Sequence, residues 1–165
     1  MSNLDQLQDD ARIWIFGGHE SFDSAQTDRL QNGLNSFVSQ WTAHGSPLAA
    51  GFGFIERRFV VVGVNPGVPP SGCSIDRLFR IMQEAEREIR VPLLDSTSIY
   101  FRTQSGEVAA ASRADFRQRV ELGEVTAQTS VFDTTIETMS QFRGNFEKRA
   151  ADSWHAAAFG IEGSF

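Results

Sequence analysis

Residues 59–76 read FVVVGVNPGVPPSGCSID, and they join an apolar run to an amphipathic helix. The run at 59–64 is continuously apolar, which is typical of a central strand covered on both faces. We predict that the helix begins near Ser74, its N-cap, and ends before Pro92. The first N–H groups of a helix have no partner inside the helix and favour an anion or a thiolate. We therefore place the candidate site at this turn.

The turn contains Cys73, the only cysteine of the chain. A position beside a helix N-terminus activates a thiol, so Cys73 is the candidate nucleophile. Gly72, Ser74 and Asp76 complete the predicted ligand-binding turn, because glycine lets the backbone approach a ligand. The simpler interpretation is a helix cap with a small buried cysteine beside it.

A second loop follows the first predicted strand, at residues 12–16. Gly17, Gly18 and His19 form this loop, and we expect it to converge with the Cys73 turn on one pocket for a small anion. If Cys73 is a nucleophile, His19 is the predicted base, because thiol catalysis needs a base in contact. We expect His44, which follows the first helix, to lie at the opposite end of the sheet from Cys73.

The order of the predicted elements is β-α-β-β-α-β. It matches a ferredoxin-like core, in which one antiparallel sheet carries two helices on one face. A doubly wound α/β sheet is the alternative. The pattern at residues 124–150 predicts no definite element. The predicted elements are strand 12–16, helix 24–44, strands 50–56 and 59–64, helix 74–90, strands 98–102 and 108–111, and helix 112–121.

The length of 165 residues predicts one domain over residues 1–165. We expect a core at about 11–111, a C-terminal extension at about 112–159 and a flexible tail at 160–165. Within the extension, Trp154 and Phe159 are candidates to cover the sheet face that carries no helix. A homodimer covering that face, or an open sheet edge, is the other possibility, and exposed Phe or Trp there would indicate it.

Composition excludes several classes of protein. The net charge is −6, which argues against a nucleic-acid partner. One cysteine permits no internal disulfide, and His19, His44 and His155 are too far apart in the sequence to predict a metal site; we expect His155 at the surface. We expect no cofactor, no membrane segment and a cytoplasmic location, because the chain has neither a long apolar run nor a signal-peptide pattern.

Four motifs are spread along the chain: Asp10 to Ile15, Gln40 to Gly45 with Pro47-Leu48, Ser71 to Asp76, and Asp152 to Trp154. Together they resemble a family of short bacterial proteins that often carry the label ABC transporter ATPase. They cover roughly residues 10–159, and the resemblance implies no definite activity. The label disagrees with the sequence, because ATP binding of that class needs a Gly-x-x-x-x-Gly-Lys-Ser/Thr loop. The only lysine, Lys148, follows no such loop, so we predict no ABC-type ATPase activity.

The sequence thus predicts an α+β protein without fixing its function. A binding or interaction module with a site at the turn before the second long helix is the first hypothesis. A thiol-dependent enzyme that uses Cys73 is the alternative. A small anionic ligand and a second copy of the chain are the expected partners.

Overall fold

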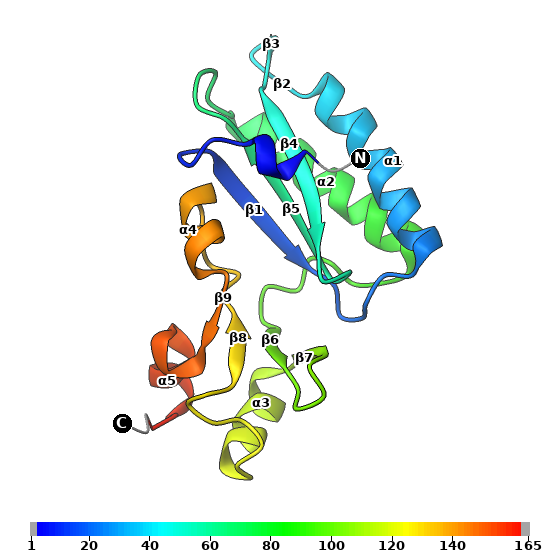
Figure 1. Cartoon of the computed structure of the whole chain (residues 1–165). Helices are drawn as coiled ribbons and strands as arrows, with labels where there is room; N and C mark the ends of the chain where they lie inside the picture. The colour runs from blue at the N-terminus through cyan, green and yellow to red at the C-terminus, as the bar shows by residue number, and fades with distance from the viewer. Residues whose placement is uncertain (1–2, 163–165) are drawn as a thin grey trace. The chain divides into compact units, whose positions relative to one another are not determined.

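The computed structural model describes residues 3–162, which form two compact units. The first unit holds residues 3–94 and 135–144, and the second holds residues 95–134 and 145–162 (Figure 1). Both units combine helices with antiparallel strands, so the predicted α+β class is confirmed. Every strand pair between the named strands is antiparallel, which excludes the doubly wound alternative for the described residues.

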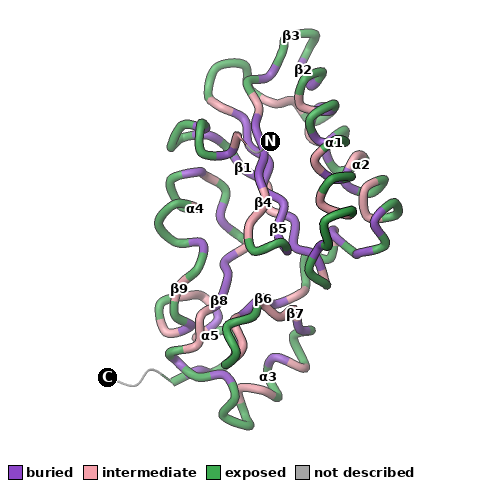
Figure 2. Tube along the Cα trace, turned by 45° about the vertical axis from the view of Figure 1, so that its right-hand side comes forward, coloured by how far each residue is buried: buried purple, intermediate pink, exposed green. Residues whose placement is uncertain are grey.

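The sheet of the first unit contains β1 (Arg12–Gly17), β4 (Ala50–Ile55) and β5 (Phe59–Val64) in the order β1-β5-β4. The predicted strands 50–56 and 59–64 are confirmed as β4 and β5, which form a hairpin whose turn uses Glu56 and Arg57, both with positive φ. Such a turn matches the right-handed twist of the paired strands. The central strand, β5, is buried along its whole length (Figure 2).

Helices α1 (Ser24–Gln40) and α2 (Gly72–Ile89) cover one face of this sheet (Figure 1). Alternate residues of the strands face these helices, because side chains of a strand alternate between its two faces. The helices contribute an apolar stripe at helical spacing to the same core. The buried core of this unit includes Phe16, Phe52, Val60, Val62, Leu30, Leu34, Phe37, Trp41, Leu78 and Met82.

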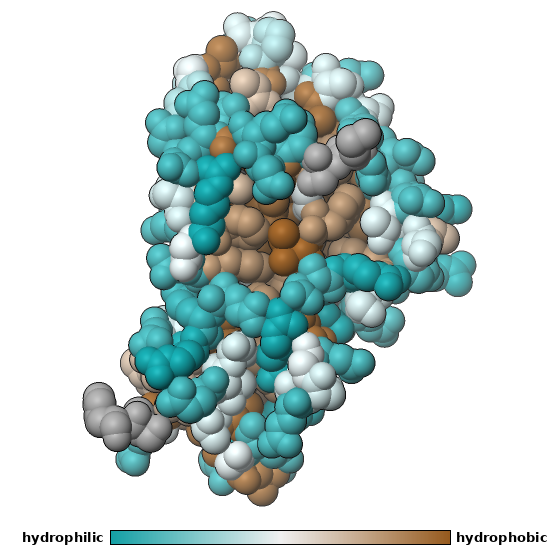
Figure 3. Space-filling model, in the orientation of Figure 1, coloured by the Kyte–Doolittle hydropathy of each residue, from teal (hydrophilic) through white to brown (hydrophobic). Residues whose placement is uncertain are grey.

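The opposite face of the sheet is lined in part by glycine. Leu7, just after η1 (Leu4–Gln6), packs so closely on Gly63 that an added Cβ atom would lie 2.5 Å from Leu7 Cδ1. The Asn3 side chain accepts a hydrogen bond from the Phe52 N–H at 2.9 Å. Leu4 and Leu7 are buried, so this lead-in is part of the fold. In the view of Figure 3, apolar atoms gather over the strands of the first unit, inside a more hydrophilic rim.

The outer edge of β1 is covered by a segment from much later in the chain. Ile13 donates its N–H to Glu137 O at 2.8 Å, and Met139 donates its N–H to Ala11 O at 3.0 Å. Residues 137–139 therefore protect an edge that would otherwise present unpaired backbone groups. The segment continues into α4 (Met139–Asn145). A short hairpin, β2 (Thr42–Ala43) with β3 (Ser46–Pro47), completes this unit.

The second unit has a four-stranded antiparallel sheet in the order β7-β6-β8-β9. Its core consists of apolar residues from β6, β8, α3 and α5, with Phe116 fully buried at its centre. Its elements are β6 (Ile99–Arg102), β7 (Val108–Ala111), α3 (Arg113–Glu121), β8 (Ser130–Phe132), β9 (Glu147–Arg149), η2 (Ala150–Asp152) and α5 (Trp154–Phe159).

The structure does not confirm the complete ferredoxin-like core. The elements β1, α1, β4, β5 and α2 follow the predicted order, with β5 between β1 and β4. The predicted fourth strand, β6, instead pairs with β7 and β8 in the other sheet. Of the predicted tail at 160–165, Ile161 is buried in the core of the second unit, and residues 163–165 lie outside the described part of the chain.

Candidate functional site

The turn before α2 is a helix cap that begins earlier than predicted. Ser71 is the N-cap: its Oγ accepts a hydrogen bond from Ser74 N–H at 3.1 Å, and its N–H donates to Ser74 Oγ at 2.6 Å. Ser74 therefore lies inside the helix and is buried. Cys73 and Asp76 are exposed, so the interpretation of Cys73 as a buried cysteine is wrong. Gly72 is the first residue of α2 and is also exposed.

The predicted second loop lies at the other end of the sheet. Gly17, the last residue of β1, pairs with Phe59, the first residue of β5, because the two strands are antiparallel. The Cys73 turn follows the far end of β5, so the length of that strand, roughly 20 Å, separates the two loops. The predicted convergence of Gly17, Gly18 and His19 with Cys73 is therefore not formed.

The loop after β1 is held by a buried arginine. Arg58 Nη1 donates to Gly18 O at 3.2 Å and to His19 O at 2.9 Å, and Gly18 N–H donates to Arg58 O at 2.7 Å. His19 N–H also donates to Pro92 O, just after α2, at 3.2 Å. These bonds fix the loop as a structural connection, with its carbonyl groups turned to the guanidinium.

His44 lies at the same end of the sheet as Cys73, whereas we predicted that it lies at the opposite end. Trp41, the C-cap of α1, donates its Nε1–H to Ser74 O at 2.8 Å. The end of α1 is thereby fixed beside the start of α2, and His44 follows in the turn between β2 and β3. It reaches the same end as Cys73 because α1 runs back along the sheet. His44 is exposed and has a positive φ of 50°, which indicates a turn residue.

The second unit carries a different candidate site, on the exposed face of α3. Arg113 and Arg117 are one helical turn apart and both are exposed. They line an open depression of about 530 Å³ with Gln118 and Glu121. Ser112 caps the helix by accepting a hydrogen bond from Asp115 N–H at 3.1 Å.

Two aromatic rings from α5 support the guanidinium groups of these arginines. Arg113 Cζ lies 5.7 Å from the ring centre of Trp154 and 5.8 Å from that of Phe159. Arg117 Cζ lies 5.6 Å from the Phe159 ring centre. A cation over a ring face is attracted by the quadrupole of the ring. The rings therefore position the two guanidinium groups by cation–π contacts, which do not use their N–H groups as conventional hydrogen-bond donors.

Neither guanidinium forms an ion pair within residues 3–162. The other arginines of the second unit all do: Arg102 binds Glu147 at 2.6 Å, Arg119 binds Asp115 at 3.3 Å, and Arg149 binds Asp152 at 2.9 Å. The hydrogen bond from Arg102 lowers the pKa of Glu147, as expected of a paired carboxylate. Positive charge without a carboxylate partner is thus concentrated on one face of α3.

Trp154 is itself fixed by a buried carboxylate at the edge of its ring. Its Nε1–H donates to Asp133 Oδ1 at 3.2 Å, and the other oxygen of Asp133 binds Lys148 Nζ at 3.1 Å. The Trp154 ring also stacks on His155, with ring centres 3.9 Å apart. One ring thus contacts His155, Arg113 and Asp133, so its orientation is set by three groups.

His155 is buried, and the expectation that it lies at the surface is wrong. Burial lowers its pKa to about 4, assisted by the charges of Lys148 and Arg113 and opposed by that of Asp133. His155 Nδ1 lies 2.7 Å from Ser153 Oγ. The neutral His155 imidazole that stacks on Trp154 adds no positive charge, so it needs no carboxylate to balance it.

Sequence reasoning missed this site because its parts are distant in the chain. The spacing Arg-x-x-x-Arg in a polar helix usually indicates a solvated face. Only the position of Trp154, more than 30 residues later, makes the arginines distinctive. The one available signal was that Arg113 directly follows the capping serine.

Among residues 3–162, no group of three His, Cys, Asp or Glu side chains is arranged to hold a metal ion. No helix within the same range has the length and apolar character that crossing a membrane requires. Comparisons of this chain with protein-family models, with curated proteins and with solved structures find no match. The resemblance to the family of short bacterial proteins therefore stays a prediction.

Proposed function

We propose that the protein is a binding module for a small ligand that carries an oxyanion, and that Arg113 and Arg117 bind it. The observation that carries this proposal is the pair of guanidinium groups on one face of α3 with no acidic partner among the described residues. Guanidinium groups form strong bidentate hydrogen bonds with carboxylate and phosphate oxygens. We keep the predicted small anion as the partner, and we place its binding site at Arg113 and Arg117 instead of the turn at Cys73.

A phosphate monoester fits this pair better than a carboxylate does. Two guanidinium forks one turn apart on a helix offer at least four donors directed to one side. A phosphate monoester has three terminal oxygens and close to two negative charges at neutral pH, whereas a carboxylate has two oxygens and one charge. We therefore expect the dianion to bind more tightly.

The surroundings of Trp154 indicate that the ligand has no nucleobase stacked on this ring. His155 stacks on the Trp154 ring and the Arg113 guanidinium also lies over this ring, so two neighbouring groups already occupy ring surface that a nucleobase would need. Stacking on a ring is the usual means of holding a base of a single strand. We expect recognition of the anionic group alone, and this agrees with the sequence-based exclusion of a nucleic-acid partner.

Titration calorimetry on the full chain tests the proposal. Phenyl phosphate and inorganic phosphate are titrated at constant ionic strength, with acetate as the weaker anion. Arg113→Gln and Arg117→Gln are each expected to weaken phosphate binding by about tenfold, as the loss of charged hydrogen bonds requires. In parallel, the indole N–H resonance of Trp154, assigned with Trp154→Phe, is expected to shift on binding.

A matched control removes the same charge elsewhere. Arg77 and Arg80 are exposed arginines on α2, and replacing both by Gln changes the net charge by the same amount as Arg113→Gln with Arg117→Gln. The control is expected to bind phosphate as the wild type does. If both double variants lose the same phosphate affinity, the effect is general electrostatic attraction, and the proposal is contradicted. Absence of binding at millimolar phosphate also contradicts it.

We also propose a fold type for the first unit and a cellular compartment for the protein. The order β1-α1-β4-β5-α2 supports the first unit as an incomplete ferredoxin-like core, in which residues 137–139 take the edge beside β1. An exposed single cysteine supports a reducing compartment, and hence the cytoplasm.

A further inference from the structure

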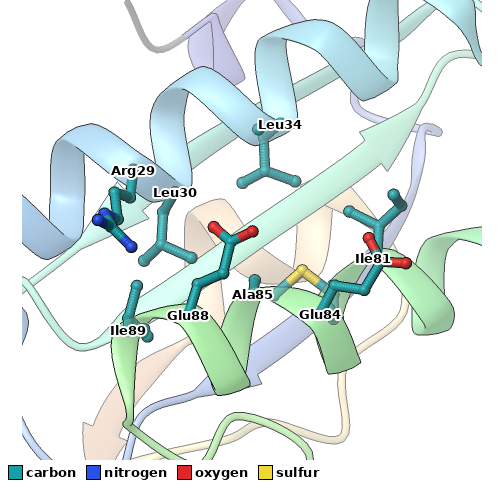
Figure 4. A pocket seen from close by; sticks show the side chains of 10 residues that line it. Arg29, Leu30, Leu34, Ile81, Glu84, Ala85, Glu88 and Ile89 are labelled. Atoms are coloured by element: carbon teal, nitrogen blue, oxygen red, sulfur yellow. The ribbon is translucent and has the colours of Figure 1, made fainter.

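The helical face of the first unit has a groove between α1 and α2 (Figure 4). Its cavity of about 80 Å³ is lined by apolar side chains, among them Leu30, Leu34, Ile81 and Met82. The two helices are antiparallel, and Gln26 near the start of α1 donates its Nε2–H to Ile89 O at the end of α2, at 2.8 Å. The groove lies between the middle of α1 and the second half of α2.

Gly33 opens this groove on the α1 side. It lies in the interior of the helix, where glycine is less favourable than alanine by roughly 0.5–1 kcal/mol. A Cβ atom added there meets no atom within 4 Å, so packing inside this chain does not require glycine. A glycine on a helix surface permits close approach by another backbone, as at small-residue helix contacts.

After Arg29, the exposed face of α1 carries no charged residue. From residue 30 to residue 55 the sequence contains no Asp, Glu, Lys or Arg, although such residues make up 22% of the chain. The exposed positions of α1 after Arg29 are instead Asn, Ser, Gln and Gly. Depletion of charged residues distinguishes the centre of a protein interface from ordinary surface.

The two rims of the groove carry opposite charges. Arg29 lies on the α1 rim, and Glu84 and Glu88 lie on the α2 rim (Figure 4). None of the three forms an ion pair within the described residues. Glu84 and Glu88 are one turn apart, where like charges repel each other. The rims thus present charges that the chain itself does not neutralise.

We propose that this face is the interface of a homodimer with its two-fold axis along the groove. A rotation of 180° about that axis places α1 of each copy over α2 of its partner, at the same level along the groove. Arg29 of one copy then faces Glu84 and Glu88 of the other, and the same contact occurs twice, as an isologous interface requires. The absent side chain of Gly33 lets the helices of the two copies approach.

This interface is independent of the proposed anion site, which belongs to the second unit. It also differs from the predicted homodimer, which was expected to cover an open sheet edge or the helix-free face of the sheet, with exposed Phe or Trp on that face. The large apolar residues exposed within residues 3–162 are Val68, Phe79 and Leu122, and none of them belongs to a strand.

A charge-reversal experiment by sedimentation equilibrium on the full chain tests the dimer. Arg29→Glu and the double change Glu84→Arg with Glu88→Arg are each expected to raise the dimer dissociation constant by at least about tenfold, because like charges then oppose one another. Mixing the two variants places the carboxylate introduced at position 29 of one chain opposite the arginines introduced in the other, and the second contact stays native. Equimolar mixtures are therefore expected to form heterodimers with an affinity near that of the wild type.

Gly33→Gln is the uncharged counterpart, with Asn32→Gln as its matched control, because Asn32 is exposed and does not line the groove. Gly33→Gln is expected to weaken the dimer and Asn32→Gln to leave it unchanged, while circular dichroism verifies that each variant is folded. A wild type that stays monomeric at every concentration overturns the proposal. Folded charge variants that dimerise like the wild type, or that fail to associate when mixed, also overturn it.

Discussion

Lys148 Nζ lies 3.1 Å from Oδ2 of the buried Asp133, which joins the only lysine of the chain to the carboxylate that accepts the hydrogen bond of the Trp154 indole. The pairing of β8 with β9 brings the two residues together, because Val131 lies opposite Lys148. The Lys148 side chain is 20% exposed and that of Asp133 only 9%. Removing water from such a pair costs free energy, which the ion pair and the Trp154 hydrogen bond offset.

Asp133→Asn is expected to lower the free energy of unfolding by roughly 3 kcal/mol, because it leaves the Lys148 ammonium without its counter-charge in a largely buried site. Urea unfolding followed by circular dichroism measures the loss. The double variant with Lys148→Met is expected to recover most of it, since the uncompensated charge is then absent. Losses that simply add in the double variant would show that the two side chains are not coupled.

Protein stability is expected to fall as the pH is lowered from 6.5 towards 4. The folded protein keeps His155 neutral down to about pH 4, whereas the unfolded chain protonates it near its ordinary pKa of 6.5. The unfolded state binds more protons between these values, so folding is progressively disfavoured there and the loss levels off below pH 4. The change attributable to His155 is on the order of 2 kcal/mol.

His155→Asn isolates this contribution from that of the carboxylates. The amide can still accept a hydrogen bond from Ser153 and does not titrate, so the variant is expected to lose the extra slope between pH 6.5 and 4. Unfolding curves of both proteins at matched pH values provide the comparison. An unchanged slope in the variant would contradict the assignment of the buried, neutral imidazole.

Two glycine-to-alanine changes are expected to have opposite signs. Gly33→Ala should raise the free energy of unfolding by about 0.5–1 kcal/mol at concentrations where the chain is monomeric, because the new Cβ meets no neighbour. Gly18→Ala should lower it by roughly 1–3 kcal/mol, because its Cβ would lie 2.8 Å from Glu20 O and 2.7 Å from Phe22 Cε1. Thermal and urea unfolding measure both, and stabilisation by Gly18→Ala would contradict the packing of that loop.

Cys73 is expected to react with a maleimide in the folded protein, because it is exposed in the first turn of α2. Cys73→Ala should change the free energy of unfolding by less than about 0.5 kcal/mol, as is usual for an exposed site, and should leave phosphate binding intact. Mass spectrometry of the native protein follows the modification. A thiol that reacts only in denaturant would contradict the exposure of Cys73, and a variant that loses phosphate binding would return the site to the Cys73 turn.

The local elements of the first unit were predictable because their signals are local. The continuous apolar run of β5 and the apolar stripe of α2 are decided within short windows, and both elements are confirmed. The N-cap of α2 was misplaced by three residues because Ser71 and Ser74 are equally good cap residues, and only the Ser71 Oγ contact with Ser74 N–H decides between them. The mixture of strand and helix patterns likewise decided the α+β class.

The pairing of β6 and the location of the site were not predictable, because both depend on distant segments. Phe101 of β6 pairs with Val131, which lies in the stretch whose pattern is weakest. The positions of His19 and His44 follow from strand direction. In an antiparallel sheet with β5 beside β1, the loop after β1 and the turn after β5 lie at opposite ends, so the predicted topology already excluded the convergence that we expected. The arginines of α3 become a site only through Trp154, which the chain supplies much later.

The segment at 137–139 that closes the edge of β1 has a consequence for synthesis on the ribosome. Strand β1 emerges early, but its outer neighbour is translated only after β6, β7, α3 and β8 have been made. Throughout that interval the nascent chain presents a strand edge with unpaired backbone groups, which is the feature that recruits other strands. A product truncated after residue 134 would keep this edge permanently open, so full-length translation protects the first unit as well as completing the second.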